Sequence, residues 1–311
     1  MIKYIVKRIS LAIVIMITLS IITFLLMKLA PGDPVRYIVR QDIAFISEDV
    51  LEETRRALNL DQSLIMQWWI WFKGILTLNF GTSYQTGQTV LKEIVFYSRP
   101  TFTLAILTLI VVISISVPLG VIAAYTHNSV FDRMIQIFTS LTVSVPSFFL
   151  GIILIFIFNK LLGILPSSGY YSPKYLIMPV LAISLGMLAY YVRFVRVNMI
   201  ELIHGKVARA YRLRGINEFS IMWNDLLIPS IIPMITMLGM SLSGLVGGTI
   251  VIEYLFNIPG LGTFLIESIR ARDYPVVQGM VLVLGALVII GNTLADIIVG
   301  ILSPEHRTKG N

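Results

Sequence analysis

Six apolar runs of membrane-spanning length are the feature of this 311-residue sequence that most constrains its fold. A helix needs about 20 mainly apolar residues to cross the hydrocarbon core of a bilayer. The composition agrees, because 56% of the residues are hydrophobic and only 13% are charged, against about 25% in soluble domains. We therefore predict an all-α membrane protein with six transmembrane helices. The runs cover roughly residues 9–27, 101–124, 134–158, 175–197, 230–252 and 276–300.

The first run is a signal peptide or a retained span. It is longer than the apolar region of a signal peptide, and no small-x-small cleavage site follows it. Ala30-Pro-Gly-Asp-Pro34 then ends the helix, because proline lacks a backbone donor. We interpret residues 1–30 as the first transmembrane helix, with its N-terminus in the cytoplasm.

Residues 31–100 form the one long polar region, which we expect on the extracytoplasmic side. Residues 47–58 have helical spacing, with acidic residues in the first turn. Residues 64–78 are too short and too amphipathic to span. Trp68, Trp69 and Trp71 lie there, and we predict that they anchor the segment at the membrane interface, where indole rings are favoured. Stacking against a ligand is the alternative role.

We expect residues 101–302 to form a five-helix core and residues 303–311 a cytoplasmic tail. The charges of the short loops predict how these helices are oriented in the membrane. Basic residues of short cytoplasmic loops outnumber those of short external loops in most membrane proteins. With both termini inside, the external short loops hold Lys160, Lys174, Arg270 and Arg272. The cytoplasmic set is larger and includes Lys3, Lys7, Arg8, Arg133, Arg193, Arg196, Lys206, Arg209, Arg212, Arg214, Arg307 and Lys309. The sequence therefore places both termini and the loop 199–229 in the cytoplasm.

The loop 199–229 is the longest polar interruption in the C-terminal half. Residues 206–214 read as a short basic helix that ends at Gly215, because glycine permits a turn with positive φ. Asn217 is the expected N-cap of a second helix. One interpretation is a loop whose charge only fixes the topology, and the other is a surface that an aqueous partner binds. The apolar stripe of the first helix consists of Val207, Ala210, Tyr211 and Leu213.

The span 230–252 carries two adjacent rows of small residues at a spacing of four. Such rows allow two helices to approach closely. The face either packs against another span of this chain or lies at a central interface that lines a transport path. Its members are Gly239, Ser243, Gly244, Gly247 and Gly248.

Prolines and one carboxylate mark other spans. Pro118, Pro146 and Pro179 are expected to kink or bend their helices. Asn292 and Asp296 lie one turn apart near the cytoplasmic end of the last span, where a solvated or helix-bridging role is the expectation.

Several chemistries are excluded by missing residues. The chain has no cysteine, so no thiolate site is possible, and its three histidines are far apart in the sequence, so the sequence indicates no histidine cluster. Neither a GxxxxGK[ST] phosphate loop nor the HExxH and GxSxG motifs of hydrolases occur. We therefore expect no enzyme activity and no ATP binding by this chain.

Motifs along the whole sequence resemble a known family. The loop with Gly215 and the later Pro233 resembles the cytoplasmic EAA loop of bacterial ABC-importer permeases, although Gly205, Lys206, Tyr211 and Asp225 depart from its pattern. Eight strings, in the family's order, resemble the first-permease subunit of dipeptide, oligopeptide and nickel importers. They are Leu29-Ala-Pro-Gly-Asp-Pro34, Leu58-Asn-Leu-Asp61, Asn79-Phe-Gly-Thr-Ser83, Val117-Pro-Leu-Gly120, Pro146-Ser-Phe-Phe149, Leu165-Pro-Ser-Ser-Gly169, Pro259-Gly-Leu-Gly262 and Arg272-Asp-Tyr-Pro275.

The resemblance implies a type I ABC-importer permease in the bacterial cytoplasmic membrane. Its expected partners are a second homologous permease, two ATPases that bind ATP and magnesium, and an extracytoplasmic solute-binding protein; no nucleic acid is expected. The small-residue face would lie at the translocation interface. The implied ATPase contacts are Val207, Arg209, Ala210, Tyr211, Arg212, Leu213 and Gly215.

Two strings lean toward the nickel-type permeases, namely Arg212-Leu-Arg-Gly-Ile-Asn217 and Gly247-Gly-Thr-Ile-Val-Ile-Glu253. The implied substrate is nickel, as a chelate because metal ligands are scarce, and a dipeptide or oligopeptide is the alternative.

Overall fold

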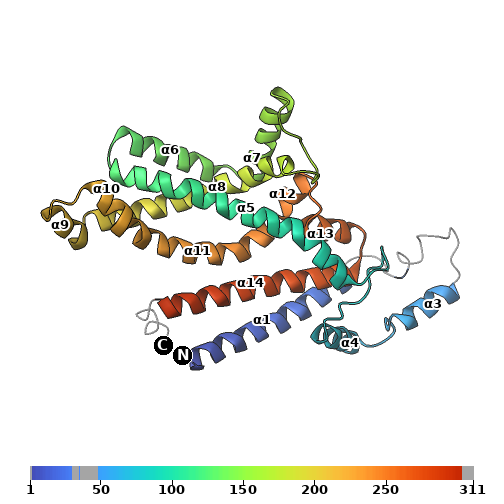
Figure 1. The fold of residues 1–311 in the computed structure, drawn as a ribbon. Helices are drawn as coiled ribbons and strands as arrows, with labels where there is room; N and C mark the ends of the chain where they lie inside the picture. The colour runs from blue at the N-terminus through green and yellow to red at the C-terminus, as the bar shows by residue number, and fades with distance from the viewer. Residues whose placement is uncertain (1, 30–34, 36–47, 303–311) are drawn as a thin grey trace. The chain divides into compact units, whose positions relative to one another are not determined.

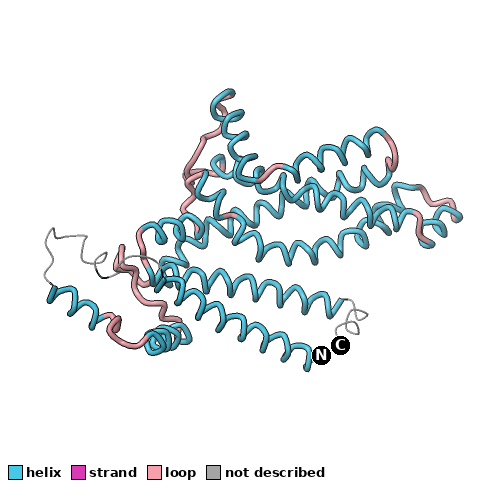
Figure 2. Tube along the Cα trace, turned by 180° about the vertical axis from the view of Figure 1, so that it is seen from behind, coloured by secondary structure: helices cyan, strands magenta, loops and turns pink. Residues whose placement is uncertain are grey.

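The computed structural model describes residues 2–29, 35 and 48–302, and Figures 1 and 2 show that these residues are mainly helical. Within those ranges the only extended pairing is an antiparallel bridge between Thr82 and Thr89. The all-α prediction is confirmed for this part of the chain. The break expected at 30–34 and the tail 303–311 lie outside the described residues.

Two compact units make up the chain, and each is described by itself. The first consists of residues 1–100 and 260–290, and the second of residues 101–259 and 291–311. The long helices α5 (Val90–Tyr125) and α14 (Tyr274–Leu302) each contribute residues to both units.

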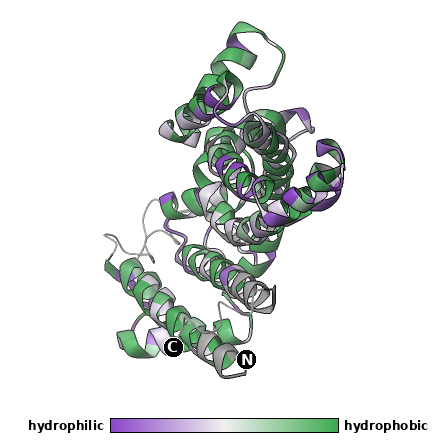
Figure 3. Cartoon of the chain, turned by 90° about the vertical axis from the view of Figure 1, so that its left-hand side faces the viewer, coloured by the Kyte–Doolittle hydropathy of each residue, from purple (hydrophilic) through white to green (hydrophobic). Residues whose placement is uncertain are grey.

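The predicted number of spans agrees with the helices if one bent pair counts as a span. By length and composition, five helices of the described ranges are long and apolar enough to cross a membrane. They are Ile9–Leu29, Val90–Tyr125, Lys174–Ile203, Glu218–Gly239 and Tyr274–Thr293. Figure 3 shows these long helices coloured mainly as hydrophobic.

The remaining run, 134–158, is not one straight helix. α6 (Val130–Ser144) is followed by α7 (Ser147–Leu154) and the π-helix η1 (Ile155–Leu161), with a bend of 101° between the two parts. The bend lies at Pro146, which has no amide hydrogen to continue the helix and restricts the residue before it. The expected bending role of Pro146 is thus observed, whereas Pro118 and Pro179 lie inside continuous helices.

The first unit packs the predicted amphipathic segment against the first span. It contains α1 (Ile2–Leu29), α3 (Glu48–Ala57), α4 (Leu64–Leu76) and α13 (Leu261–Arg270). The indole of Trp68 donates a hydrogen bond to Ser20 Oγ at 3.3 Å. The rings of Trp71 and Phe24 lie 6.2 Å apart. The helices expected at 47–58 and 64–78 are confirmed.

Two of the family-like strings meet in the first unit at the buried carboxylate of Asp273. The hydroxyl of Ser83 donates to Asp273 Oδ2 at 2.5 Å, and the Gln85 amide donates to the same oxygen at 3.2 Å. Tyr84 lies between Ser83 and Gln85 in the sequence. Its burial and the nearby charge of Asp273 raise its pKa to about 12. The tyrosine is therefore neutral at any physiological pH.

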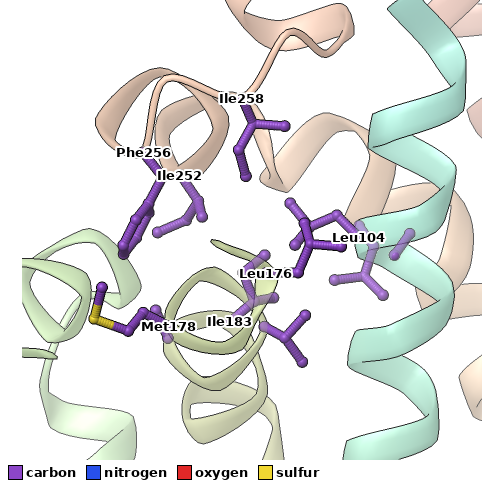
Figure 4. Close-up of a cluster of buried hydrophobic side chains, with 11 residues drawn as sticks. Leu104, Leu176, Met178, Ile183, Ile252, Phe256 and Ile258 are labelled. Atoms are coloured by element: carbon purple, nitrogen blue, oxygen red, sulfur yellow. The ribbon is translucent and has the colours of Figure 1, made fainter. Parts of the chain in front are cut away.

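The second unit is built around α8 (Lys174–Ile203), which α6, α7, α11 (Leu227–Gly248) and α12 (Ile250–Leu255) contact. At one end, buried side chains of α5, α8 and the α12 region form a core that Figure 4 shows in close-up. This core includes Leu104, Leu176, Met178, Ile183, Ile252, Phe256 and Ile258. A second buried cluster joins α5, α8 and α11 through Val112, Tyr191, Val195, Met234 and Leu238.

Candidate functional site

The segment between α8 and α11 begins with a short helix and a tight turn. α9 (Lys206–Leu213) is followed by Gly215, whose φ is +75°. The amide of Ile216 donates to the carbonyl of Tyr211 (3.2 Å), and the amide of Gly215 donates to the carbonyl of Arg212 (3.0 Å). This Schellman arrangement satisfies the last carbonyls of the helix and needs a left-handed residue at its end. The prediction that Gly215 ends the helix is confirmed.

A second short helix follows, as predicted. α10 (Glu218–Ile221) is capped by Asn217, whose side-chain oxygen accepts a hydrogen bond from the Ser220 amide at 2.7 Å. The π-helix η2 (Met222–Leu226) then connects α10 to α11. Figure 1 shows α9 and α10 together at one end of the second unit.

Arg212 holds this loop together from within. Its Nη1 donates to the carbonyl of Ile203 at the end of α8 (2.9 Å), and its Nε and Nη2 donate to the carboxylate of Glu218. Hydrogen bonding to Glu218 raises the pKa of Arg212 above its ordinary value. The guanidinium therefore stays charged and fixes α9 relative to α8 and α10.

The inner side of α9 packs against the protein itself. Ala208 is fully buried and Tyr211 is half-buried, in a cluster that includes Met199 and Ile221. The expected outer stripe is therefore corrected at Tyr211. Its ring fills space beneath α9, because α9 packs against α8 and α10.

The outer side of α9 carries apolar residues that nothing in the described chain covers. Val207 is 58% exposed and Leu213 is 85% exposed. Arg209 and Ala210 are also exposed beside them. Among the expected ATPase contacts, Val207, Ala210 and Leu213 thus form a small apolar surface with a cation next to it.

A buried ion pair lies in the same unit, and sequence reasoning missed it. Arg196 of α8 donates two hydrogen bonds of 2.7 Å to the carboxylate of Asp132 in the first turn of α6. Asp132 is only 1% exposed, and it also accepts from Gln136 (2.8 Å) and the Asn128 amide (3.0 Å). A single carboxylate in an apolar helix was the signal available in the sequence, because such a group requires a partner.

Within its own unit, the row of small residues on α11 is open. Gly239, Gly244, Gly247 and Gly248 are exposed, and a Cβ atom added to any of them would meet nothing within 4 Å. The side chain of Ser243 lies outside the described part. Within that unit, this face therefore has room for the close approach of another helix.

Other candidate residues are not brought together. Asn292 is exposed on α14, and the side chain of Asp296 is outside the described part. Within the described ranges, no three histidine, aspartate or glutamate side chains are close enough to hold a metal ion. His127 lies 3.0 Å from Arg196, and His204 caps the end of α8.

Comparison with known families gives matches over nearly the whole chain. Residues 116–308 match the family described as binding-protein-dependent transport system inner membrane component. Residues 1–106 match the N-terminal part described for the same kind of membrane component. Both units of the structure are represented in these matches.

Curated relatives match over the same length. The nickel import system permease protein NikB of Staphylococcus aureus strain MRSA252 is 43% identical over 308 residues, which cover 99% of this chain and 93% of the relative. The proteins of the same name from strains USA300 and N315 give the same identity and coverage.

Proposed function

This chain belongs to the family of binding-protein-dependent transport system inner membrane components, and from that premise we propose that it is the permease of a nickel importer. The single observation that supports nickel as the substrate is the full-length identity of 43% to nickel import permeases. A dipeptide or oligopeptide is the second candidate, because the family-like strings of the sequence are shared with peptide permeases.

Nickel would cross this protein as a chelate. The chain has no cysteine, and its described residues hold no cluster of metal ligands. A nickel ion binds imidazole and thiolate ligands tightly, so a bare ion would find few partners along such a path. A chelator that fills the coordination sphere would leave this protein only polar and shape-based contacts to provide.

Energy would reach the permease from partner subunits. We infer a second permease against the open glycine face of α11, two ATPases that bind ATP and magnesium on the cytoplasmic side, and an extracytoplasmic solute-binding protein. The outer residues of α9 are the proposed ATPase contact. Full burial of Leu213 alone would contribute about 1.5–3 kcal/mol to that contact.

The proposed mechanism is mechanical. Closure of the ATPases would push on α9, and the Arg212 contacts would transmit this push to α8 and α10. Because α8 is the central helix of its unit, its displacement would move the helices that pack against it. The spans would then alternate between outward and inward access.

Uptake measurements in a strain that lacks the chromosomal copy test this function. The gene for this chain is put back on a plasmid together with the genes for the other transporter subunits. The cells then receive radiolabelled nickel with or without histidine as chelator. Nickel accumulation that depends on this chain, and that histidine increases, is the expected result. Uptake of a labelled dipeptide without nickel uptake would establish the second candidate instead.

A further inference from the structure

An exposed aromatic and aliphatic stripe runs from the loop between α8 and α11 into the start of α11. Phe219 is 72% exposed, Trp223 59%, Ile228 62% and Ile232 47%. The rings of Phe219 and Trp223 are stacked, with centroids 6.4 Å apart and planes 7° apart. The stripe is separate from the outer surface of α9, and along α11 it lies in line with Gly239, which follows Ile232 by seven residues, or two helical turns.

The π-helix η2 keeps this stripe in line. The spacings along it are four, five and four residues, and the step of five, from Trp223 to Ile228, crosses η2. A turn with i to i+5 hydrogen bonds brings a residue five positions later to the same side of the helix. An ordinary α-helical turn would rotate Ile228 away from the two rings, so η2 is what makes the surface continuous.

The opposite side of the same arm is already buried in the protein. Ile221 is fully buried, Leu226 is 1% exposed, and Met222 packs against their cluster. Polar side chains lie between the two apolar sides, where Asn224 donates to Ser220 Oγ at 3.0 Å. The arm formed by α10 and η2 is therefore apolar on two sides, and only one of them faces the protein's own core.

The position of the stripe identifies its occupant. By length and composition, the membrane-spanning stretch of this region begins at Glu218, so Phe219 and Trp223 lie in its first turns. Those turns are at the depth of the lipid headgroups, where indole rings are favoured. The stripe then continues into the exposed side of α11. Exposed cations of the preceding segment, such as Arg209 of α9 and Arg214 directly after it, suit anionic headgroups.

We propose that Phe219 and Trp223 insert into the headgroup region of the cytoplasmic leaflet and anchor the arm there. The proposed ATPase contact then ends near Gly215, and the arm beyond it is held by lipid. Such an anchor fixes one end of the coupling loop at the membrane surface, so that a push on α9 moves α8 and does not tilt the whole loop. This assignment of the leaflet rests on the function and orientation proposed above.

Fluorescence quenching by brominated lipids tests the anchor. The chain has four tryptophans, and three of them are Trp68, Trp69 and Trp71 of α4. In the variant with these three changed to phenylalanine, Trp223 is the only tryptophan of this chain, and the emission of the partner subunits is removed by subtracting the profile of the same complex with Trp223→Phe. The assembled transporter is placed in phosphatidylcholine and phosphatidylglycerol nanodiscs. Loss of emission should be greater with bromines near the headgroup than with bromines near the end of the acyl chain.

Trp68 and Trp71 contact α1, so the triple variant risks misfolding. A second measurement avoids this risk by subtracting the quenching profile of Trp223→Phe from that of the wild-type chain. As a matched control, the same subtraction is applied to a variant in which the tryptophan is moved from the stripe to α9 by Leu213→Trp and Trp223→Phe. We expect this indole to be insensitive to brominated lipid and to be shielded from iodide only when the ATPases are bound.

Two results would overturn the anchor. Emission of Trp223 that brominated lipid leaves unchanged, and that ATPase binding shields from iodide, would assign the stripe to the ATPase. Trp223 emission that neither brominated lipid nor iodide quenches would assign the stripe to a contact with a second permease. The measurement contains no nickel, so a failure of the nickel assignment in the uptake experiment leaves its outcome unchanged.

Discussion

Gly215 shows most directly how one residue determines the geometry of the loop. Its φ of +75° lies in the left-handed region, and a Cβ atom added there would meet nothing within 4 Å. A change at this position therefore acts through backbone conformation and not through a steric clash. The left-handed conformation costs about 1–2 kcal/mol for most residues with a side chain and is least tolerated by β-branched ones.

We predict that Gly215→Val abolishes uptake while the protein still inserts into the membrane. Valine disfavours the left-handed turn, so α10 would no longer be placed against α9 and Arg212 would lose its register with Glu218. Uptake and membrane content are measured together. Asparagine adopts the left-handed conformation more readily, so Gly215→Asn is the matched control and should retain most of the uptake. Equal activity of both variants would contradict the role of this turn.

A second prediction at this scale concerns Leu213. Because this side chain is 85% exposed, Leu213→Asp should leave thermal stability unchanged within about 0.5 kcal/mol. It should abolish uptake and uncouple ATP hydrolysis from the solute-binding protein, since a carboxylate cannot be buried unpaired in a groove. Leu213→Met keeps the apolar contact and serves as the control. Normal uptake with aspartate here would show that α9 does not seat in an ATPase.

At the scale of the elements, the ion pair between Asp132 and Arg196 joins α6 to α8. The Asp132 side chain is 1% exposed and that of Arg196 15%, and the contact is bidentate. Removal of one partner leaves the other charge buried and unpaired, which typically costs about 3–5 kcal/mol. Replacement of both partners by apolar residues avoids this penalty.

We therefore predict that Asp132→Ala lowers the stability of the purified protein by several kcal/mol, as a lower midpoint of thermal unfolding in detergent. The double variant Asp132→Leu with Arg196→Leu should recover much of this loss. In this double variant, apolar packing in place of the ion pair would hold α6 against α8. A single variant as stable as the wild-type chain would mean that water or another group solvates Arg196.

At the scale of the whole molecule, the open face of α11 bears on assembly. A Cβ atom added to the glycines of this face would meet nothing within 4 Å, so their substitution should not disturb the fold of the unit that contains α11. We predict that Gly244→Leu inserts normally but fails to co-purify with the second permease, because leucine keeps the two helix backbones apart. Gly239→Ala changes the volume least and is the control. Normal assembly and uptake with leucine would show that the face contacts lipid.

The orientation of the chain is a further prediction at this scale. Reporter fusions after Lys309 should be active only in the cytoplasm, and fusions within residues 48–76 only outside. The physical reason is that the short loops on the same side of the membrane as the N-terminus hold more basic residues than those on the other side. A C-terminal reporter that is active only outside would reverse the proposed side of the coupling loop.

The sequence by itself determined the class of the protein and its local signals. Long apolar runs predict helices because a backbone in lipid must satisfy its own hydrogen bonds, and this holds whatever the helices contact. The turn at Gly215 and the cap at Asn217 were also predictable. Both depend on hydrogen bonds between residues a few positions apart, and local spacing is legible in a sequence.

Only the tertiary structure decided which side each residue faces and what it meets. Tyr211 and Leu213 are two residues apart and so lie on opposite sides of a helix, but only the packing of α9 decided that Tyr211 is the one beneath it and Leu213 the exposed one. Asp132 and Arg196 pair across 64 positions, and Ser83 and Asp273 across 190. The π-helix η2 aligns Trp223 with Ile228 although their spacing fits no α-helix. These features depend on packing between distant segments, which the order of residues along the chain does not display.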